Sequence, residues 1–510
     1  MIARALLLAA AGGLALSACA VGPDYVRPKP AADATGAFAE PAVSDPQASR
    51  VSTAAAGGQW WKLFEDPALD RLVADALAHN PDVRTAAANL QQARGVLSEA
   101  RGARLPTTTP SASYTRQRIG AGALAGQGIP GAGAAGPTHY DFDFYQLGFD
   151  ASYEVDLFGR VTRSIQAARG DAEAAAANLD AARIAVAAET ARTYASACSS
   201  AAQAAVARET AELQEQTLDL TRRLLAGGRG TQRDLDQATV LAENARAQVP
   251  TFEAERRASL YALAVLTGRP PAEVDQAAAQ CTVAPRVKTP IPVGDGAALL
   301  ARRPDVRAAE RRLAAQTARI GVATAALYPS ITLAGSATLG ATRTGDLGSA
   351  RSFGFSLGPL IQWSFPNISV ARARIRQAEA GTAASLATFD KTVLAALSET
   401  EQALARYAGA LDSDAARERS AAAAEDAAKL SRLRFDSGRD SFLQLLDAER
   451  DRATARAALA QSRATLASAQ VSLFKALGGG WEDAPAIDTG VRIGTGDVVA
   501  SERRSAAAPR

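Results

Sequence analysis

Carboxylates lie just past two glycine-rich breaks in the sequence. The stretch Leu433–Asp447 reads LRFDSGRDSFLQLLD, and the stretch Leu225–Gln237 reads LAGGRGTQRDLDQ. Each interrupts a long alanine-rich pattern, with Gly438 in one and Gly228 in the other. Glycine adopts the left-handed conformation that ends a helix, so each break predicts the turn of an αα-hairpin. Two such hairpins favour the narrow end of a helical tube, where close carboxylates repel one another and attract cations. Ordinary coiled-coil turns with solvated charges fit these stretches equally well.

The remaining side chains with chemical potential are few. His79 and His139 are far apart and have no neighbours at metal-ligand spacing. No Ser-His-Asp motif, phosphate loop or CxxC is present. The formal net charge is +3 with acidic and basic residues interleaved, which gives no electrostatic case for nucleic acid. We therefore expect neither an enzyme nor a bound metal or cofactor.

Two cysteines, Cys198 and Cys281, flank the first predicted hairpin. Cys198 lies roughly as far before the turn as the end of the returning arm, near Gly268, lies after it. Both thiols could therefore sit at a similar height, and an exported protein can hold a disulfide. A Cys198–Cys281 bridge and two free buried thiols both remain open.

The N-terminus carries an export signal. Arg4 precedes the apolar run Ala5–Leu16, which is too short to span a bilayer and indicates a signal peptide over residues 1–18. The run ends in Leu16-Ser17-Ala18-Cys19, which resembles a bacterial lipobox and implies a lipid on the Cys19 thiol. The next residue is alanine rather than aspartate, which by the same resemblance favours the outer membrane. Beyond residue 18 no apolar run is long enough for a transmembrane helix.

Two proline-free, alanine-rich stretches predict very long helices, from about Arg160 to Ala226 and from about Ser369 to Phe435. Roughly 65 residues at 1.5 Å per residue give ~100 Å for each. Apolar residues step by threes and fours along them, which indicates lengthwise helix packing. A soluble coiled-coil bundle would show the same pattern.

Four short runs between the helical stretches alternate apolar and polar residues. Each is about ten residues or shorter, which is typical of a strand between lipid and a wet lumen, although a half-buried soluble sheet also fits. A loop rich in glycine, alanine and proline, Ile119–Thr138, separates the first two runs, and its counterpart Thr342–Arg351 is shorter. The runs are Thr108–Arg118, Tyr145–Val155, Ile331–Leu339 and Phe353–Leu357.

The chain contains an internal duplication. Asn80-Pro81-Asp82-Val83-Arg84 returns as Arg303-Pro304-Asp305-Val306-Arg307, an offset of 304 − 81 = 223. Gly228 and Gly268 return as Gly438 and Gly478, an offset of 438 − 228 = 210. Each copy predicts a helix, two strands, a long helix, a turn and a long helix. We place an extended tether at 19–58, the first repeat at 59–285, the second at 286–480 and a disordered tail at 481–510.

The motifs resemble those of the outer-membrane efflux protein (TolC-type) family, in its lipoprotein branch that serves RND-type tripartite pumps. The similarity covers about residues 58 to 480. It implies a homotrimer in which four strands per chain complete a shared transmembrane β-barrel and the helices form a periplasmic α-helical barrel. The motifs that carry it are Trp60-Trp61-x-x-Phe64-x-Asp66-Pro67-x-Leu69, the twin Pro-Asp-Val-Arg segments, Asp156-Leu157-Phe158-Gly159-Arg160, Leu266-Thr267-Gly268 and Leu445-Leu446-Asp447.

The resemblance also implies a constriction at the hairpin tips. It assigns Asp447 to an acidic ring in the pore and Asp234 to a contact of the first hairpin. Where some members carry a second ring aspartate this chain has Gln444, and Asp440 occupies a position that can be basic, with Arg439 adjacent. Phe435 matches an aromatic gate residue.

The function implied is a passive exit duct, lipid-anchored in the bacterial outer membrane, for drugs or other toxic small molecules. It would take its cargo from an inner-membrane pump, of RND type, through a periplasmic adaptor protein. One alternative is a type I protein-secretion duct, which shares the architecture but commonly lacks a lipobox. Another is a coiled-coil envelope lipoprotein without a pore, and an envelope enzyme has the least support.

Overall fold

A computed structural model describes residues 20–29, 35–39, 51–54, 57–120, 138–363, 365 and 367–482. The chain divides into two units by its internal contacts. The strand unit holds the segment up to Arg27 together with Gln92–Glu173 and Arg311–Ala387, and the helical unit holds the rest. The predicted signal peptide, Cys19, residues 121–137 of the predicted loop and all of the tail after residue 482 lie outside the described residues.

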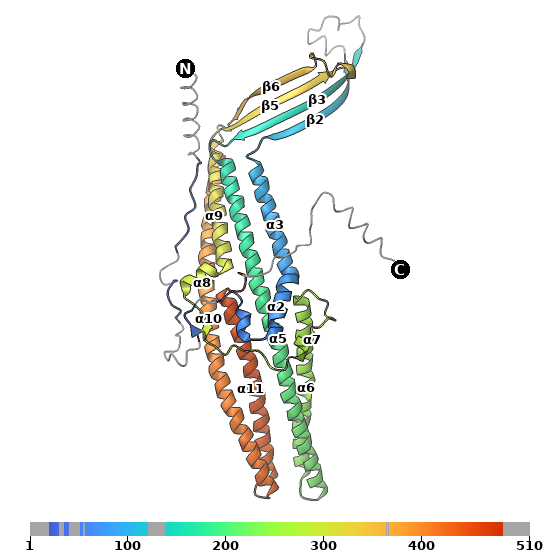
Figure 1. The fold of residues 1–510 in the computed structure, drawn as a ribbon, viewed down its shortest axis with the longest axis vertical. Coiled ribbons are helices and arrows are strands. Elements are labelled where there is room, and N and C mark those ends of the chain that lie inside the picture. Colours follow the sequence, from blue (N-terminus) through green and yellow to red (C-terminus); the bar gives the residue numbers. More distant parts are fainter. Residues whose placement is uncertain are drawn as a thin grey trace. The chain divides into compact units, whose positions relative to one another are not determined.

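The order of elements confirms the predicted duplication (Figure 1). Each copy has helix, strand, strand, long helix and returning helix, with short extra helices before the second copy. The first copy contains η2 Trp60–Phe64, α2 Pro67–His79, α3 Pro81–Gly102, β2 Thr107–Gly120, β3 His139–Val155, α5 Arg160–Ala226 and α6 Gln232–Leu266. The short helix α7, Gln276–Gln280, follows α6 before the second copy begins. The second copy contains α8 Gly296–Arg302, α9 Pro304–Ala325, β5 Ser330–Ala341, η3 Thr344–Asp346, β6 Phe353–Gln362, α10 Ile368–Asp436 and α11 Phe442–Leu477.

The four predicted strands form one antiparallel sheet in the order β2-β3-β5-β6 (Figure 1). Its register aligns Phe149, Ala337 and Phe355 across β3, β5 and β6. The next residues along, Asp150, Ser336 and Ser356, are aligned in the same way. Because neighbouring residues of a strand point to opposite faces, the part of the sheet from Tyr145 to Val155 has one mainly apolar face and one mainly polar face. Within the described chain, β2 and β6 each leave one edge without a partner strand.

The first strand pair is longer than the alternation predicts. The loop expected from Ile119 begins later, because Ile119 pairs with Tyr140 and Gly120 pairs with His139. His139 therefore belongs to β3. The added residues of β3 also alternate, but Tyr140, Phe142 and Phe144 lie on the face opposite to Tyr145. Because the alternation changes phase at Tyr145, a search for one continuous apolar face ends there, although the backbone pairing continues.

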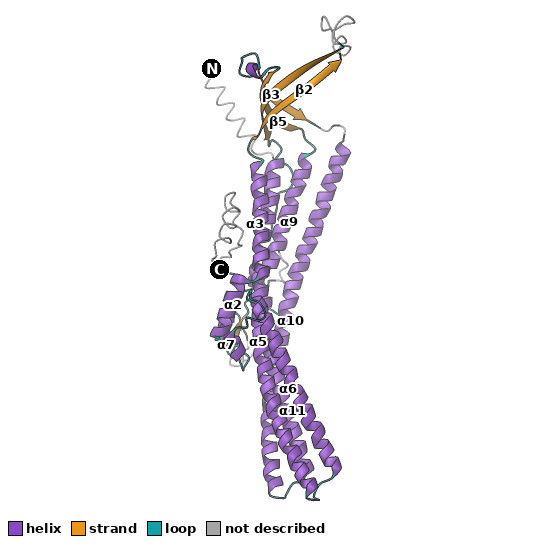
Figure 2. Ribbon diagram, turned by 90° about the vertical axis from the view of Figure 1, so that its right-hand side faces the viewer, coloured by secondary structure: helices purple, strands orange, loops and turns teal. Residues whose placement is uncertain are grey.

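The two long helices, α5 and α10, have 67 and 69 residues, as their freedom from proline predicts. The returning helix α6 continues through Pro250, which lacks the N–H that would bond to the preceding turn. Figure 2 shows α6 and α11 as the shorter arms of the two helical hairpins. The hairpin prediction is confirmed for both copies.

The tryptophan motif is part of the core of the helical unit. Trp60 is 2% exposed and its ring stacks on Phe474 of α11 at 5.0 Å between centroids. Asp66 caps α2 by accepting hydrogen bonds from the N–H groups of Ala68 and Leu69. The motif thus joins the start of the first repeat to the end of the second. The apolar face predicted for α2 is buried, and consists of Leu69, Leu72, Val73, Ala76 and Leu77.

The described parts of the segment predicted as an extended tether contain no helix before Gln59, and they are held against the protein. Val51–Ser52, strand β1, pairs in parallel with β4, Ile291–Pro292. Ala39 donates its N–H to the Glu401 carboxylate. A composition without periodicity excludes a helix, but extended backbone still has donors and acceptors that a neighbouring segment can pair.

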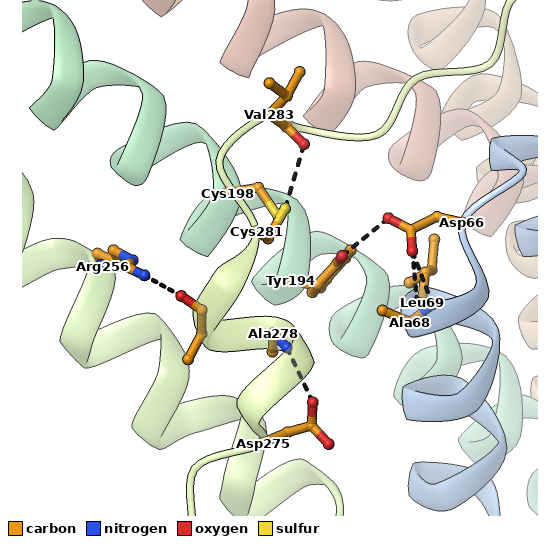
Figure 3. The surroundings of a disulfide bond; sticks show 11 residues. Asp66, Ala68, Leu69, Tyr194, Cys198, Arg256, Asp275, Ala278, Cys281 and Val283 are labelled. Atoms are coloured by element: carbon orange, nitrogen blue, oxygen red, sulfur yellow. Dashed lines mark hydrogen bonds between the residues drawn. A yellow bond between two sulfur atoms is a disulfide. The ribbon is translucent and has the colours of Figure 1, made fainter.

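A disulfide joins Cys198 on α5 to Cys281 after α7, across a sequence separation of 83 (Figure 3). Of the two arrangements that the sequence leaves open, the structure has the bridge. Nearby, the Tyr194 hydroxyl donates to Asp66 at 2.9 Å. Burial first, and this hydrogen bond second, raise the pKa of the Tyr194 phenol above its usual range. Cys198 is fully buried among these contacts.

We expect Cys281→Ser to lower the free energy of unfolding by about 2–4 kcal/mol, because the unfolded chain loses a long-range constraint. Thermal unfolding without reductant measures this difference. Cys281 is the better site, since a serine at Cys198 would also bury a hydroxyl. With reductant the difference between the two proteins should disappear. Two alkylated thiols in the unreduced, denatured parent protein would contradict the bridge.

Candidate gate at the hairpin turns

Both hairpin turns are closed by a glycine in the left-handed region. Gly228 has φ 69° and Gly438 has φ 71°. A side chain at either position would meet no atom within 4 Å, so the backbone angle alone favours glycine. In each turn the following arginine, Arg229 or Arg439, donates its backbone N–H across the glycine to the helix end at 2.8 Å. The two turns are the same structure in the two repeats.

The two returning helices begin with the same capping box. Thr231 and Asp234 exchange hydrogen bonds at the start of α6, and Ser441 and Gln444 do so at the start of α11. The offset of 210 relates both pairs: 441 − 231 and 444 − 234. Hydrogen bonds from Thr231 to its carboxylate hold the pKa of Asp234 below its usual range. The side chains of Asp234 and Gln444 are thus already bonded to their own helix ends.

Asp440 is paired within its own turn. Its carboxylate accepts a hydrogen bond from Arg434 Nε at 2.7 Å and its side chain is only 10% exposed. Its partner is therefore Arg434, six residues earlier, while the side chain of the adjacent Arg439 is exposed. The ring of Phe435 meets that of Phe442 edge to face, at 6.1 Å between centroids. Phe442 opens α11, so this contact closes the second hairpin from within.

Asp447 lies in a groove between the two returning helices. A cavity of 570 Å³ is lined from α6 by Arg233 and Asp236 and from α11 by Asp447 and Arg450, among others. The Asp447 carboxylate is 54% exposed and lies 3.4 Å from the Arg450 guanidinium. Two acidic and two basic side chains therefore share this groove. The sequence predicted Asp447 but not its three charged neighbours, because two of them come from the other hairpin and neither hairpin's own pattern reveals the pairing.

Further from the turns, a network of charged side chains connects the two hairpins. Glu449 on α11 is 3% exposed and forms an ion pair with Arg452, with 2.7 Å between the charged atoms. Arg456, one turn further, bridges Glu425 on α10 and Glu209 on α5. Its bond with Glu209 raises the pKa of the Arg456 guanidinium. The repeated arginine spacing on α11 is the only trace of this network in the sequence.

The family motifs lie at backbone junctions. Asn80, between α2 and α3, donates to the Leu266 carbonyl at 3.0 Å, and Arg303, between α8 and α9, donates to the Ala476 carbonyl at 2.9 Å. These contacts are equivalent in the two repeats: 303 − 80 = 223 and 476 − 266 = 210. Each fixes the end of a returning helix beside a left-handed glycine, Gly268 or Gly478 in turn. The duplication thus extends to individual hydrogen bonds.

The described residues contain no group of three or more histidine, cysteine, aspartate or glutamate side chains placed to hold a metal ion. Among the same residues, no helix combines the length and apolar character needed to cross a bilayer. The polar groups at the tips pair with helix ends and with one another. A sheet with one apolar and one polar face, continued by long helical hairpins, is an architecture suited to a membrane channel.

Comparison with known proteins gives the family. Residues 72–269 and 297–479 match the family described as outer membrane efflux protein, one match for each repeat. The outer membrane protein OprJ of Pseudomonas aeruginosa is 31% identical, over 92% of this chain and 95% of its own. The toluene efflux pump outer membrane protein TtgF of Pseudomonas putida is 32% identical, over 93% of this chain and 97% of its own.

Solved structures agree. The outer-membrane channel OprN has a TM-score of 0.81 and 34% identity, covering 91% of this chain and 100% of its own. The open state of the Neisseria gonorrhoeae MtrE outer membrane channel has a TM-score of 0.78 and 28% identity, covering 92% of this chain and 100% of its own. The chain belongs to the outer-membrane efflux protein family. It is an outer-membrane channel for efflux and not an enzyme.

We expect Gly228→Ala and Gly438→Ala each to destabilise their turn by about 1 kcal/mol, because alanine is strained in the left-handed region. Hydrogen exchange of the turn amides should be about fivefold faster as a result. Gly409→Ala, at an exposed site inside α10 with no atom near the added carbon, is the matched control. There alanine should slow local exchange. Equal effects at the three sites would contradict the turn geometry.

Proposed function

We propose that three copies of this chain form the outer-membrane exit duct of a tripartite efflux system. The duct is passive: an inner-membrane pump of RND type supplies the energy, and a periplasmic adaptor protein joins the pump to the duct. The cargo is drugs or other toxic small molecules. The similarity to OprJ, an outer membrane protein, and to TtgF, a toluene efflux pump outer membrane protein, supports this assignment.

The observation that carries the proposal is the pair of unpartnered strand edges. The apolar face includes Leu333, Phe355 and Leu357, which are 44%, 78% and 72% exposed, a pattern suited to lipid. Inside hydrocarbon an unpaired backbone N–H or C=O costs several kcal/mol, so an open sheet edge is excluded there. Four strands are too few to close a barrel alone, and β2 of one copy must therefore pair with β6 of another. Three copies is the number that the family resemblance implies.

A lipid on Cys19 fits the path of the residues that follow it. Val21 donates its N–H to the Phe158 carbonyl at 3.2 Å. Arg163, whose side chain is 4% exposed, bonds the Val21 and Gly22 carbonyls and the Asp24 carboxylate. The chain after Cys19 is thereby fastened where β3 meets α5, at an end of the sheet. An acyl group at Cys19 would start from that end, next to the bilayer that the sheet spans.

The hairpin turns are the proposed constriction of this duct. Asp447 would supply the acidic ring, and the nearby positive charge of Arg450 would partly offset its negative charge. Asp234 and Gln444 would stabilise the N-terminal ends of the helices at the constriction. The pair Arg434–Asp440 and the edge-to-face contact of Phe435 hold the second turn in shape. Because backbone and capping hydrogen bonds hold each turn, we expect the constriction to open by movement of whole hairpins rather than by rearrangement of the turns.

The proposal is tested by purifying the full protein in detergent. We expect a mass of three chains plus acyl groups, a heat-modifiable band on gels, and discrete conductance steps in planar bilayers. Deletion of the gene should increase sensitivity to drugs and dyes. A monomer without affinity for detergent once the acyl group is removed would overturn the proposal.

We expect Asp447→Ala to raise single-channel conductance and to weaken cation selectivity, because the variant removes the ring of close carboxylates. Planar bilayer recordings measure both. Asp426→Ala, at an exposed aspartate of α10 that does not line this groove, is the control and should leave both unchanged. If Asp447→Ala behaves like that control, Asp447 has no part in the gate.

We expect Leu357→Arg on the apolar face of β6 to destabilise the inserted protein by about 2–4 kcal/mol, the cost of arginine near the middle of a bilayer. Ser356→Arg, one residue away on the polar face, should be tolerated. The heat-modifiable trimer recovered from membranes reports the difference. Equal loss with both substitutions would mean that the two faces do not divide lipid from water.

A further inference from the structure

The apolar face of the sheet has a definite height. On β3 the outward residues from Tyr145 to Val155 are all apolar or aromatic. Ten steps of about 3.3 Å give ~33 Å along the strand, or roughly 25 Å at the usual tilt, which matches the hydrocarbon layer of an outer membrane. The series is Tyr145, Leu147, Phe149, Ala151, Tyr153 and Val155.

One carboxylate lies at the middle of this height, on the opposite face. Asp150 is exposed, is flanked on β3 by the outward residues Phe149 and Ala151, and is midway between Tyr145 and Val155. Its cross-strand partners are Thr109 on β2 and Ser336 on β5. A charge facing lipid at this depth would be prohibitive, so the face of Asp150 must be the wet one.

Asp150 is also unlike every other charged residue of the four strands. Beyond the apolar band, Arg118 pairs with Asp141 and Arg116 with Asp143. At the other end, Glu154 pairs with Arg160. The remaining acidic residue, Asp150, forms no ion pair with any described residue, and β5 and β6 carry no charged residue.

Its neighbours cannot neutralise it. Ser336 bonds Ser356 through their hydroxyls at 2.8 Å, so the level of Asp150 is a row of hydroxyl groups. Because β3 lies between β2 and β5 of its own chain, no strand of another copy adjoins Asp150. The local charge of this level is therefore fixed by one residue in each chain.

We propose that Asp150 makes the barrel lumen selective for cationic over anionic solutes at mid-membrane height. This inference rests on the proposed trimeric duct, which would place three such carboxylates at one level. Twelve strands about 4.8 Å apart give a barrel radius of roughly 12 Å. The Debye length is ~30 Å at 0.01 M salt and ~3 Å at 1 M, so the field of these carboxylates reaches the axis only at low ionic strength. The barrel lumen at the level of Asp150 therefore favours cationic and neutral cargo over anionic cargo.

The test is a thiol reporter beside the carboxylate. Ser336→Cys introduces a free thiol, since Cys198 and Cys281 are bonded to each other. Its rates of reaction with a cationic and an anionic methanethiosulfonate reagent, in the full trimer in liposomes at 10 mM salt, report the local potential. The parent protein without the reporter gives the background. The measurement does not depend on whether the hairpin tips are open, because the reagents enter through the barrel.

We expect Asp150→Asn to lower the cation-to-anion rate ratio by about three- to fivefold at 10 mM salt, and to have almost no effect at 1 M. Asp143→Asn, on the same strand but on the outward face, should leave the ratio unchanged. If the thiol reacts but Asp150→Asn does not change its cation-to-anion rate ratio, this inference is wrong while the proposed duct still stands. A thiol that reacts with neither reagent in the folded protein would overturn the water-filled duct itself.

Discussion

The structure depends on a sheet that cannot be finished by one chain. Its apolar face requires lipid, and lipid forbids the unpaired edges of β2 and β6. Neither requirement can be met by a different packing of the same four strands, because the hydrogen-bond register assigns every side chain to one face or the other. Association of identical chains satisfies both at once. A channel through the membrane follows from that closure, and no catalytic group has to be added to it.

The motif residues stabilise junctions rather than perform chemistry. Asp66 and Asp156 cap the helices that follow them, and Asn80 and Arg303 bond the ends of the returning helices. Asn80 in one repeat and Arg303 in the other donate to equivalent carbonyls. The two repeats therefore share this hydrogen bond although the donor residues differ. The arginine reaches further, and also pairs with Asp305 and Glu399. The two halves of a duplicated protein can thus differ in charge while keeping one backbone.

The polar groups at the hairpin turns have two roles: some cap the helix ends, and others face the groove between the hairpins. Asp234 and Gln444 bond their own helix ends, so a carboxylate and a neutral amide serve equally well there. Asp447 has no such bond and faces a groove shared with Arg233, Asp236 and Arg450. Because the Asp447 side chain is not hydrogen-bonded to its own helix end, it can interact with charged groups of a neighbouring hairpin.

The sequence by itself determined the duplication, the four strands, the long helices and the turns, because each depends on local periodicity, proline-free length or a glycine at a fixed place. It left open whether Cys198 and Cys281 are bonded, and it missed the full length of β2, β3 and β6, the partner of Asp440 and the network around Arg456. Only the tertiary structure decided these, along with the face on which Asp150 lies relative to its cross-strand neighbours. Each depends on which residues from distant parts of the chain meet, and such meetings are set by strand register and helix packing rather than by neighbours in sequence.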